Sequence, residues 1–167
     1  AEYGLALAND NFGDNSTVYA EALVAFAEYL GKTDQPQRSN NSLETALQIV
    51  ESKEGKKSVP YGRILSDMAY NGYRVVYRAR SRKYEEATKQ AEKALKILTK
   101  QLGSDNILLV GPKNALALIK QDNAWYETSE RKKGKLLKEV EKLEAENVNV
   151  SKSVQGEYNT RTANLMT

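Results

Sequence analysis

The sequence contains neither cysteine nor histidine, and these two absences exclude several common kinds of protein chemistry. Without thiols there is no disulfide framework, no cysteine nucleophile and no cysteine-ligated zinc site. Without imidazole there is no Ser-His-Asp triad and no histidine-carboxylate metal site. Carboxylates are present, but no pattern of neighbouring residues singles one out for catalysis. We therefore expect a protein that is not an enzyme and that uses no metal and no cofactor.

Proline is also scarce, with three residues in 167, and long apolar runs are missing. The absence of an apolar stretch of about 18 residues excludes a membrane-spanning helix. The absence of alternating β-branched residues argues against an all-β fold. Hydrophobic residues make up 40% of the chain and charged residues 28%, which is typical of a folded domain. The net charge of +3 is small for a nucleic-acid-binding protein.

The clearest helix signal lies in residues 82–106. Small residues predict the close approach of a neighbouring helix backbone, and Gly103 is expected to end the helix. Glutamates near its start and lysines near its end match the helix dipole. Its apolar residues recur at spacings of three, four and seven, as one buried helix face requires; they are Ala87, Ala91, Ala94, Leu95, Leu98 and Leu102.

This pattern recurs along the chain around three glycines, Gly13, Gly55 and Gly103. A leucine stands eight residues before each glycine, and an alanine stands fourteen residues after it. The leucines are Leu5, Leu47 and Leu95, and the alanines are Ala27, Ala69 and Ala117. Repeats with periods between about 20 and 50 residues are typical of helical arrays, in which each unit is one pair of helices.

The repeated residues resemble the tetratricopeptide repeat family, and more narrowly its longer kinesin-light-chain subtype. That subtype pairs a helix A containing a Leu-Ala step with a helix B of the form Tyr-x-x-Ala…Ala-Leu-x-Ile, followed by glycine. Here the matching residues are Met68-Ala69, Tyr84, Ala87, Ala94-Leu95, Ile97 and Gly103. The resemblance covers roughly residues 1–130. It implies an all-α fold, a right-handed α-α superhelix of about three helical hairpins with a C-terminal capping helix.

The expected boundaries of the domain and its helices follow from helix-capping residues, apolar helix faces and turn residues. Residues 1–147 form the repeat domain, and residues 148–167 form a mobile or extended tail because their apolar content falls. Residues 31–40 are expected to be a loop, and Gly111-Pro112 is expected to break or restart a helix. The expected helices are residues 3–12, 17–30, 42–54, 59–82, 85–102, a helix within 104–121, and 125–147.

The concave side of a helical-repeat array is a common binding surface. In the resembled family, helix A faces this groove at the positions three before, one after and four after its alanine. These positions hold Val24, Glu28 and Gly31, then Ser66, Tyr70 and Tyr73, then Asn114, Leu118 and Gln121. Gly31 and Gln121 depart from the aromatic or leucine expected there. Asn114 matches the family's asparagine that often hydrogen-bonds a bound peptide. The predicted partner-binding residues are Ser66, Tyr70, Tyr73, Arg74, Tyr77, Asn114 and Gln121.

Three functions remain open at this point. The first is a scaffold or adaptor that binds a protein or peptide ligand in the groove, although the tyrosines could equally serve packing. The second is a structural segment of a larger repeat array, which self-associates through exposed repeat ends such as residues 3–12. The third, least favoured, is nucleic-acid binding through the basic face of Arg74, Arg78, Arg80 and Arg82, which would lose affinity steeply with salt.

The compartment is predicted from weaker features. The chain opens on Ala1-Glu2 in the middle of an expected helix, as a mature chain after signal cleavage or a fragment of a longer array would. Together with the lack of cysteine and the polar links between helices, this start favours a bacterial periplasmic or secreted protein. A cytoplasmic protein is the alternative.

Overall fold

The computed structural model describes residues 1–155, and all regular structure in that range is helical. This confirms the expected all-α fold. No helix within those residues is both long and apolar enough to cross a membrane. In chain order the helices are α1 (Glu2–Phe12), α2 (Thr17–Lys32), α3 (Pro36–Glu54), α4 (Val59–Arg78), α5 (Glu85–Leu102), the short 3₁₀ helix η1 (Ile107–Leu109), α6 (Val110–Tyr126) and α7 (Glu130–Gln155).

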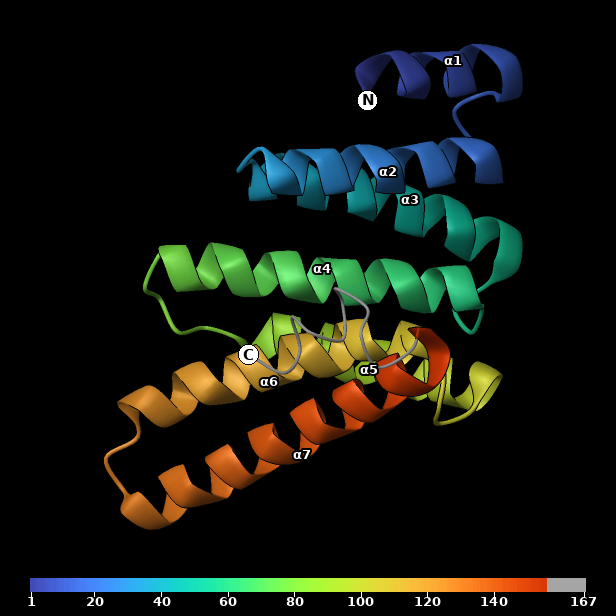
Figure 1. Cartoon of the computed structure of the whole chain (residues 1–167). Coiled ribbons are helices and arrows are strands. Elements are labelled where there is room, and N and C mark those ends of the chain that lie inside the picture. The colour runs from blue at the N-terminus through green and yellow to red at the C-terminus, as the bar shows by residue number, and fades with distance from the viewer. Residues whose placement is uncertain (156–167) are drawn as a thin grey trace.

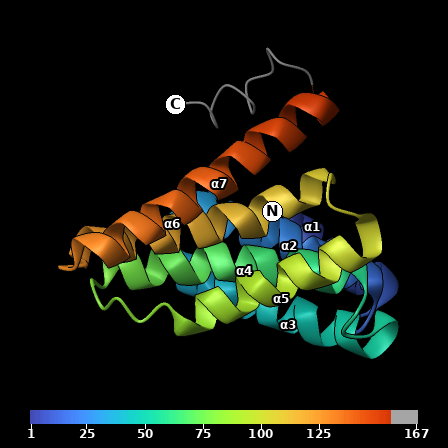
Figure 2. The same cartoon turned by 90° about the horizontal axis from the view of Figure 1, so that it is seen from below.

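Helices that are consecutive in sequence pack as three hairpins, α2 with α3, α4 with α5 and α6 with α7. Helices α2, α4 and α6 form one row, and α3 and α5 lie behind it (Figure 1). Helix α4 packs against α3, α5 and α6, so it joins all three hairpins. The third hairpin differs from the other two. The C-terminal half of α7 lies on the side of α6 away from α3 and α5 (Figure 2).

The three repeated glycines end helices in the same way. Gly13, Gly55 and Gly103 directly follow α1, α3 and α5, and their φ angles are 79°, 85° and 83°. Such φ values favour glycine because it has no Cβ. In two of the following helices a serine side chain then caps the N-terminus, Ser16 for α2 and Ser58 for α4. The predicted C-terminal glycines are therefore confirmed.

The largest part of the core lies among α2, α3 and α4, and a second part forms where the alanine stripe of α5 faces α4. Ala87, Ala91 and Ala94 are buried, and these small side chains let α4 approach closely. Gly62 of α4 contributes to the same close packing, because a Cβ there would lie 3.0 Å from the side chain of Leu98. The alanine stripe thus fixes the distance between the two helices of the second hairpin, as the sequence predicted.

The predicted loop at residues 31–40 is wrong for most of its length. Helix α2 continues to Lys32, and α3 already begins at Pro36, which occupies the first turn. The turn between them is only Thr33, Asp34 and Gln35, with Asp34 at a φ of 66°. The polar composition of residues 36–40 suggested a loop, but Pro36 and Ser39 are buried against neighbouring helices.

Two other boundaries differ from expectation. Helix α4 ends at Arg78 rather than Arg82. The expected restart near Gly111-Pro112 is present, because η1 ends at Leu109 and α6 begins at Val110, so both residues lie in the first turn of α6, where proline removes no helix hydrogen bond. Helix α7 continues past residue 147 to Gln155, with Asn147, Val150 and Ser151 buried at helical spacing. The predicted tail is therefore helical over residues 148–155, and the rest of it lies outside the described residues.

Candidate functional site

A cleft of about 530 Å³ opens between α2 and α4, and α3 forms its floor. We call it the α2–α4 cleft. Apolar side chains lie at its base, and charged side chains of both signs surround them. It is lined by Val24, Ala27, Glu28, Gly31, Lys32, Ser39, Leu43, Asp67, Tyr70, Asn71 and Arg74. Its size is in the range of pockets that bind small ligands or a few residues of a peptide.

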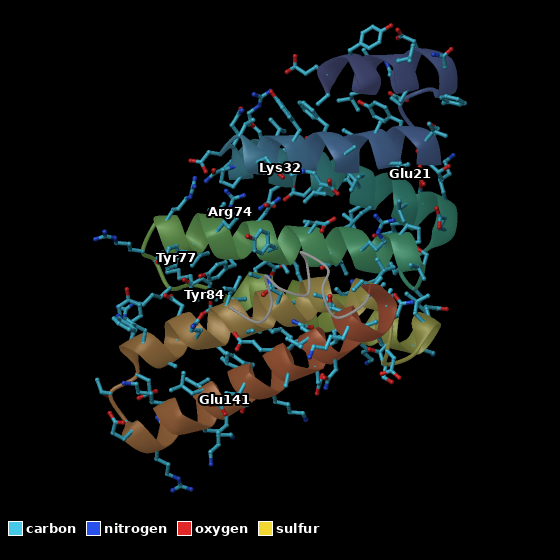
Figure 3. The ribbon with its side chains drawn as sticks, in the orientation of Figure 1. Glu21, Lys32, Arg74, Tyr77, Tyr84 and Glu141 are labelled. Atoms are coloured by element: carbon cyan, nitrogen blue, oxygen red, sulfur yellow. The ribbon has the colours of Figure 1, made fainter. Side chains whose placement is uncertain are left out.

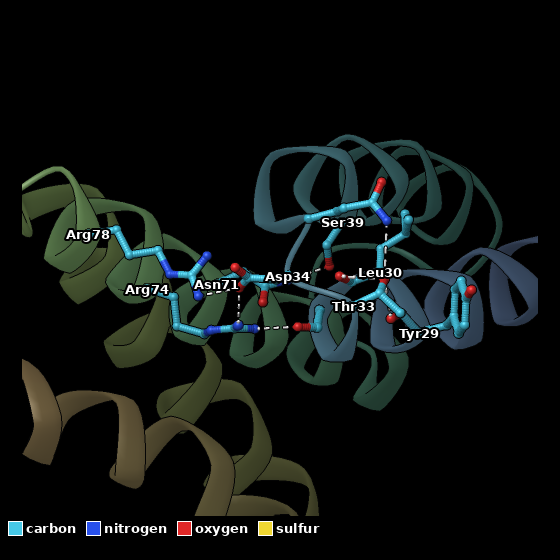
Figure 4. A network of polar contacts seen from close by, with 10 residues as sticks. Tyr29, Leu30, Thr33, Asp34, Ser39, Asn71, Arg74 and Arg78 are labelled. Atoms are coloured by element: carbon cyan, nitrogen blue, oxygen red, sulfur yellow. Dashed lines mark hydrogen bonds and ion pairs between the residues drawn. The ribbon is translucent and has the colours of Figure 1, made fainter.

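A network of hydrogen bonds fixes one end of the cleft (Figure 4). Buried Ser39 donates to the carbonyl of Ala27 at 2.7 Å and accepts from Asn71 Nδ2 at 2.6 Å. These bonds tie α2, α3 and α4 together at one point. Since each partner is satisfied inside the protein, the network holds the cleft wall in one arrangement.

Arg74 continues this network towards the α2–α3 turn. Its guanidinium donates to the Gly31 carbonyl at 2.8 Å and lies 3.3 Å from Asp34 Oδ1, which also pairs with Arg78. These two arginines hold the pKa of Asp34 below its usual value, chiefly through the Arg78 hydrogen bond. A Cβ on Gly31 would lie 3.5 Å from the guanidinium. This is an ordinary van der Waals distance, so Arg74 packs directly over Gly31 and would also fit beside an alanine there.

The middle of the cleft is acidic. Glu28 of α2 and Asp67 of α4 both line it, and both also line a smaller cavity of about 250 Å³ that reaches Leu108 and Gly111. Burial, reinforced by the Glu28 carboxylate, raises the pKa of Asp67 to about 6, although Arg63 opposes the shift. With Lys32 and Arg74 at one end, the cleft offers negative charge in its middle and positive charge beside it.

The raised pKa of Asp67 makes a pH-dependent contribution to stability. The folded-state pKa is about 6 against 3.8 for the free side chain, so the folded protein binds this proton more tightly than the unfolded chain. The contribution of Asp67 to stability therefore falls as the pH rises between these two values and stays low above pH 6. We expect the free energy of unfolding of Asp67→Asn, relative to that of wild type, to rise by about 1–3 kcal/mol between pH 3.5 and pH 8. Urea unfolding of both proteins at both pH values measures this.

The matched control for this experiment is Asp10→Asn, because Asp10 is exposed on α1. Comparing each variant with wild type at the same pH removes the contributions of all other carboxylates. A stability difference between Asp67→Asn and wild type that is the same at both pH values would contradict the assignment.

The structure separates the seven predicted binding residues into four groups. Tyr70, with 42% of its surface exposed, and Arg74 line the α2–α4 cleft. Ser66 is buried in the adjoining cavity near Gly111. Asn114 is partly buried and Gln121 is exposed on α6, and neither lines the α2–α4 cleft. Of the other groove positions, Val24, Glu28 and Gly31 line the cleft, so two of the three repeats contribute to it.

Tyr73 and Tyr77 belong to a tyrosine cluster at the end of α4. Tyr73 lies between Tyr77 and Tyr84, with ring centroids 5.7 Å apart in both pairs. Figure 3 shows Arg74, Tyr77 and Tyr84 at the same end of the hairpins. The hydroxyl of buried Tyr84 donates to Asp122 Oδ2 at 2.6 Å, which ties the start of α5 to α6. Tyr73 therefore packs between hairpins, while Tyr77 keeps an exposed edge.

Sequence reasoning missed four polar cleft residues, Lys32, Ser39, Asp67 and Asn71. Lys32 and Ser39 lay in the segment predicted to be a loop. Asp67 and Asn71 lie two residues on either side of Ala69, which are positions that the family pattern does not assign to the groove. The one available signal was Asn71, because a polar residue beside an apolar helix stripe often marks a buried hydrogen bond.

Other kinds of site lack support among residues 1–155. In that range no group of three or more aspartate and glutamate side chains could hold a metal ion. The α2–α4 cleft combines apolar and polar lining residues, as sites that receive a ligand do.

Comparisons with known proteins agree with a helical-repeat protein. No family model matches the chain. The chain is similar to amyloid protein-binding protein 2 of Rattus norvegicus and of Mus musculus, each 30% identical over 162 residues, or 97% of this chain. It spans only 27% of the length of each relative. Both relatives come from rodents, which lends no support to the expected bacterial origin. The similarity and the helical hairpins fit a tetratricopeptide-like family, while the kinesin-light-chain subtype stays a prediction.

Proposed function

We propose that the chain is a non-enzymatic protein-interaction module that binds an extended peptide or a partner helix in the α2–α4 cleft. One observation supports this proposal most directly: groove positions from two repeats line the same cleft. They are Val24, Glu28 and Gly31 from the first repeat and Tyr70 from the second. Both relatives are named as protein-binding proteins, which supports a protein partner. Because the chain matches about a quarter of each relative, the relatives' own partner is not transferred to it.

The cleft's charges suggest the kind of peptide that would fit. A basic side chain would pair with Glu28 and Asp67, and an acidic side chain or a backbone carbonyl would meet Lys32. Tyr70 offers a partly exposed ring as an anchor, and tyrosine loses little conformational entropy on binding. The network of Ser39, Asn71 and Arg74 holds the wall rigid, so a peptide would bind a largely pre-formed site.

The test uses peptides selected from a random display library on the wild-type protein. Tyr70→Ala is expected to weaken the selected peptides by at least about tenfold, as the loss of an aromatic anchor does. Isothermal titration calorimetry on each purified variant would measure this, after circular dichroism shows unchanged helicity. Tyr29→Ala is the matched control, because Tyr29 is an exposed tyrosine of α2 outside the cleft lining. Equal losses in the two variants would contradict the proposal.

A second candidate, assembly with another helical repeat, rests on α1. This helix packs mainly on α2, with one ion pair from Glu2 to Arg38 of α3, and it leaves Tyr3, Leu7 and Phe12 exposed. Tyr3 has 80% of its surface exposed, a large fraction for an aromatic residue on a helix. An apolar helix face of this kind is what a neighbouring repeat or a second copy of the chain would cover.

A further inference from the structure

A second pocket, of about 360 Å³, lies where the α4–α5 turn meets the end of α6. Three arginines and three tyrosines line it, Arg78, Arg80, Arg82, Tyr77, Tyr84 and Tyr126. We call it the arginine pocket. It lies at the end of α4, beyond Arg74, and shares no lining residue with the α2–α4 cleft. Its lining residues are therefore distinct from those of the proposed peptide site, although Asp34 pairs with Arg74 of the cleft and with Arg78 of the pocket.

Two of the arginines lack an acidic partner. Arg78 pairs with Asp34, whereas the Arg82 guanidinium lies over the Tyr126 ring, 4.8 Å from its centroid. Within residues 1–155 the Arg80 side chain makes no hydrogen bond and no ion pair. The carboxylate of Asp122 also lines the pocket, but it already accepts the Tyr84 hydroxyl. The pocket thus holds two arginines that form no ion pair within residues 1–155, beside the single carboxylate of Asp122.

The backbone of the turn adds a second observation. Arg80 and Arg82 have φ angles of 50° and 57°, in the left-handed region that glycine and asparagine adopt more readily. Elsewhere in the chain three helices end on glycines at such angles. A turn selected only for its shape would favour glycine or asparagine at positions 80 and 82 as well. Strained backbone of this kind concentrates at functional positions, and here it carries two guanidinium groups.

We propose that the arginine pocket binds the phosphate of a phosphotyrosine side chain on a partner protein. Arg80 and Arg82 supply charge-assisted hydrogen bonds to the phosphate oxygens, for which the planar guanidinium is well suited. The half-exposed rings of Tyr77 and Tyr126 supply faces on which the phosphotyrosine ring stacks. A dianionic phosphate matches two unpartnered arginines better than a single carboxylate does.

The surroundings favour a peptide over a nucleic acid. Glu85 and Glu86 follow Tyr84 directly, and Asp34 lies beside Arg78, so carboxylates border the pocket. A nucleic-acid strand carries a phosphate at every nucleotide and needs a continuous row of cations. The arginine pocket offers one local cationic site, which matches one phosphate on a peptide.

The test measures binding of a blocked glycine-serine pentapeptide with a central phosphotyrosine to the whole chain by isothermal titration calorimetry. We expect it to bind at least about tenfold more tightly than the same peptide with unmodified tyrosine. The double variant Arg80→Asn/Arg82→Asn is expected to lose this difference. Asparagine tolerates left-handed backbone, so the double variant is expected to keep the wild-type melting temperature.

Arg63→Gln is the matched control, because Arg63 is exposed near the other end of α4 and should leave phosphopeptide binding unchanged. Equal affinity for the two peptides would overturn the proposal, and so would full phosphopeptide binding by the double variant. A 12-nucleotide single-stranded DNA serves as the competing ligand. Tighter binding of this DNA than of the phosphopeptide, lost in the same double variant, would assign the pocket to nucleic acid instead.

Discussion

Replacing Leu98 by alanine is expected to lower the free energy of unfolding by about 3–5 kcal/mol. Leu98 has none of its surface exposed and fills the space beside Gly62, where α4 and α5 are closest. The loss of its methyl groups leaves a cavity that the rigid alanine stripe of α5 cannot close. Urea unfolding followed by circular dichroism measures the effect.

Leu137→Ala is the control for this prediction, because Leu137 is a leucine with 39% of its surface exposed, on α7. Leu137→Ala should lower the free energy of unfolding by about 1 kcal/mol or less. Gly62→Ala provides a further check, since its added methyl group would lie 3.0 Å from Leu98 in the wild type. We expect Gly62→Ala to destabilise wild type by about 1–3 kcal/mol but to cost less in the Leu98→Ala background. Strict additivity of the two changes would contradict this packing account.

The second large effect is expected at Tyr84. Tyr84→Ala should lower the free energy of unfolding by about 3–5 kcal/mol, because a buried ring is lost from between α4 and α6. Tyr84→Phe keeps the ring but removes the 2.6 Å hydrogen bond to Asp122. Tyr84→Phe should lower the free energy of unfolding by about 1–3 kcal/mol, because the partly buried carboxylate of Asp122 loses its hydrogen-bond donor.

Comparing Tyr84→Ala with Tyr84→Phe separates the contribution of ring packing from that of the hydrogen bond at the joint between the second and third hairpins. Tyr126→Phe, at a half-exposed tyrosine on α6, is the control and should change stability by less than about 0.5 kcal/mol. If Tyr84→Phe were as stable as wild type, the Tyr84–Asp122 bond would contribute nothing to the joint. The pKa of Tyr84 is raised by burial first and by Asp122 second, so its hydroxyl stays protonated and able to donate.

Much of the fold could be predicted because local signals and tertiary packing agree in most helices. The stripe from Ala87 to Leu102 is amphipathic, ends at a glycine and packs as its spacing requires. Gly13 and Gly55 repeat the same C-terminal signal. Predictions were wrong where packing outweighs composition. Residues 36–40 were predicted to be a polar loop, yet a proline at the helix start and the buried Ser39 make this segment helical.

The site was harder to predict than the fold for a geometric reason. The family pattern assigns groove positions from helix phase alone, and two of these positions, Val24 and Tyr70, line the cleft. Helix phase does not reveal that α4 ends at Arg78, or that Tyr73 packs between two other tyrosines. These features depend on contacts between residues far apart in sequence, such as Tyr84 with Asp122. Likewise, the acidic pair of Glu28 and Asp67 exists only because two hairpins meet.

The most direct test of the central claim is an amide chemical-shift map of the ¹⁵N-labelled chain, recorded while a selected peptide is titrated. The proposal predicts that the largest shifts fall on α2 and α4 around Val24, Gly31 and Tyr70. It also predicts that residues of the outer face of α1, such as Leu7, do not move. Shifts confined to α1, with the cleft residues unmoved, would contradict the cleft proposal and favour assembly through the exposed repeat end.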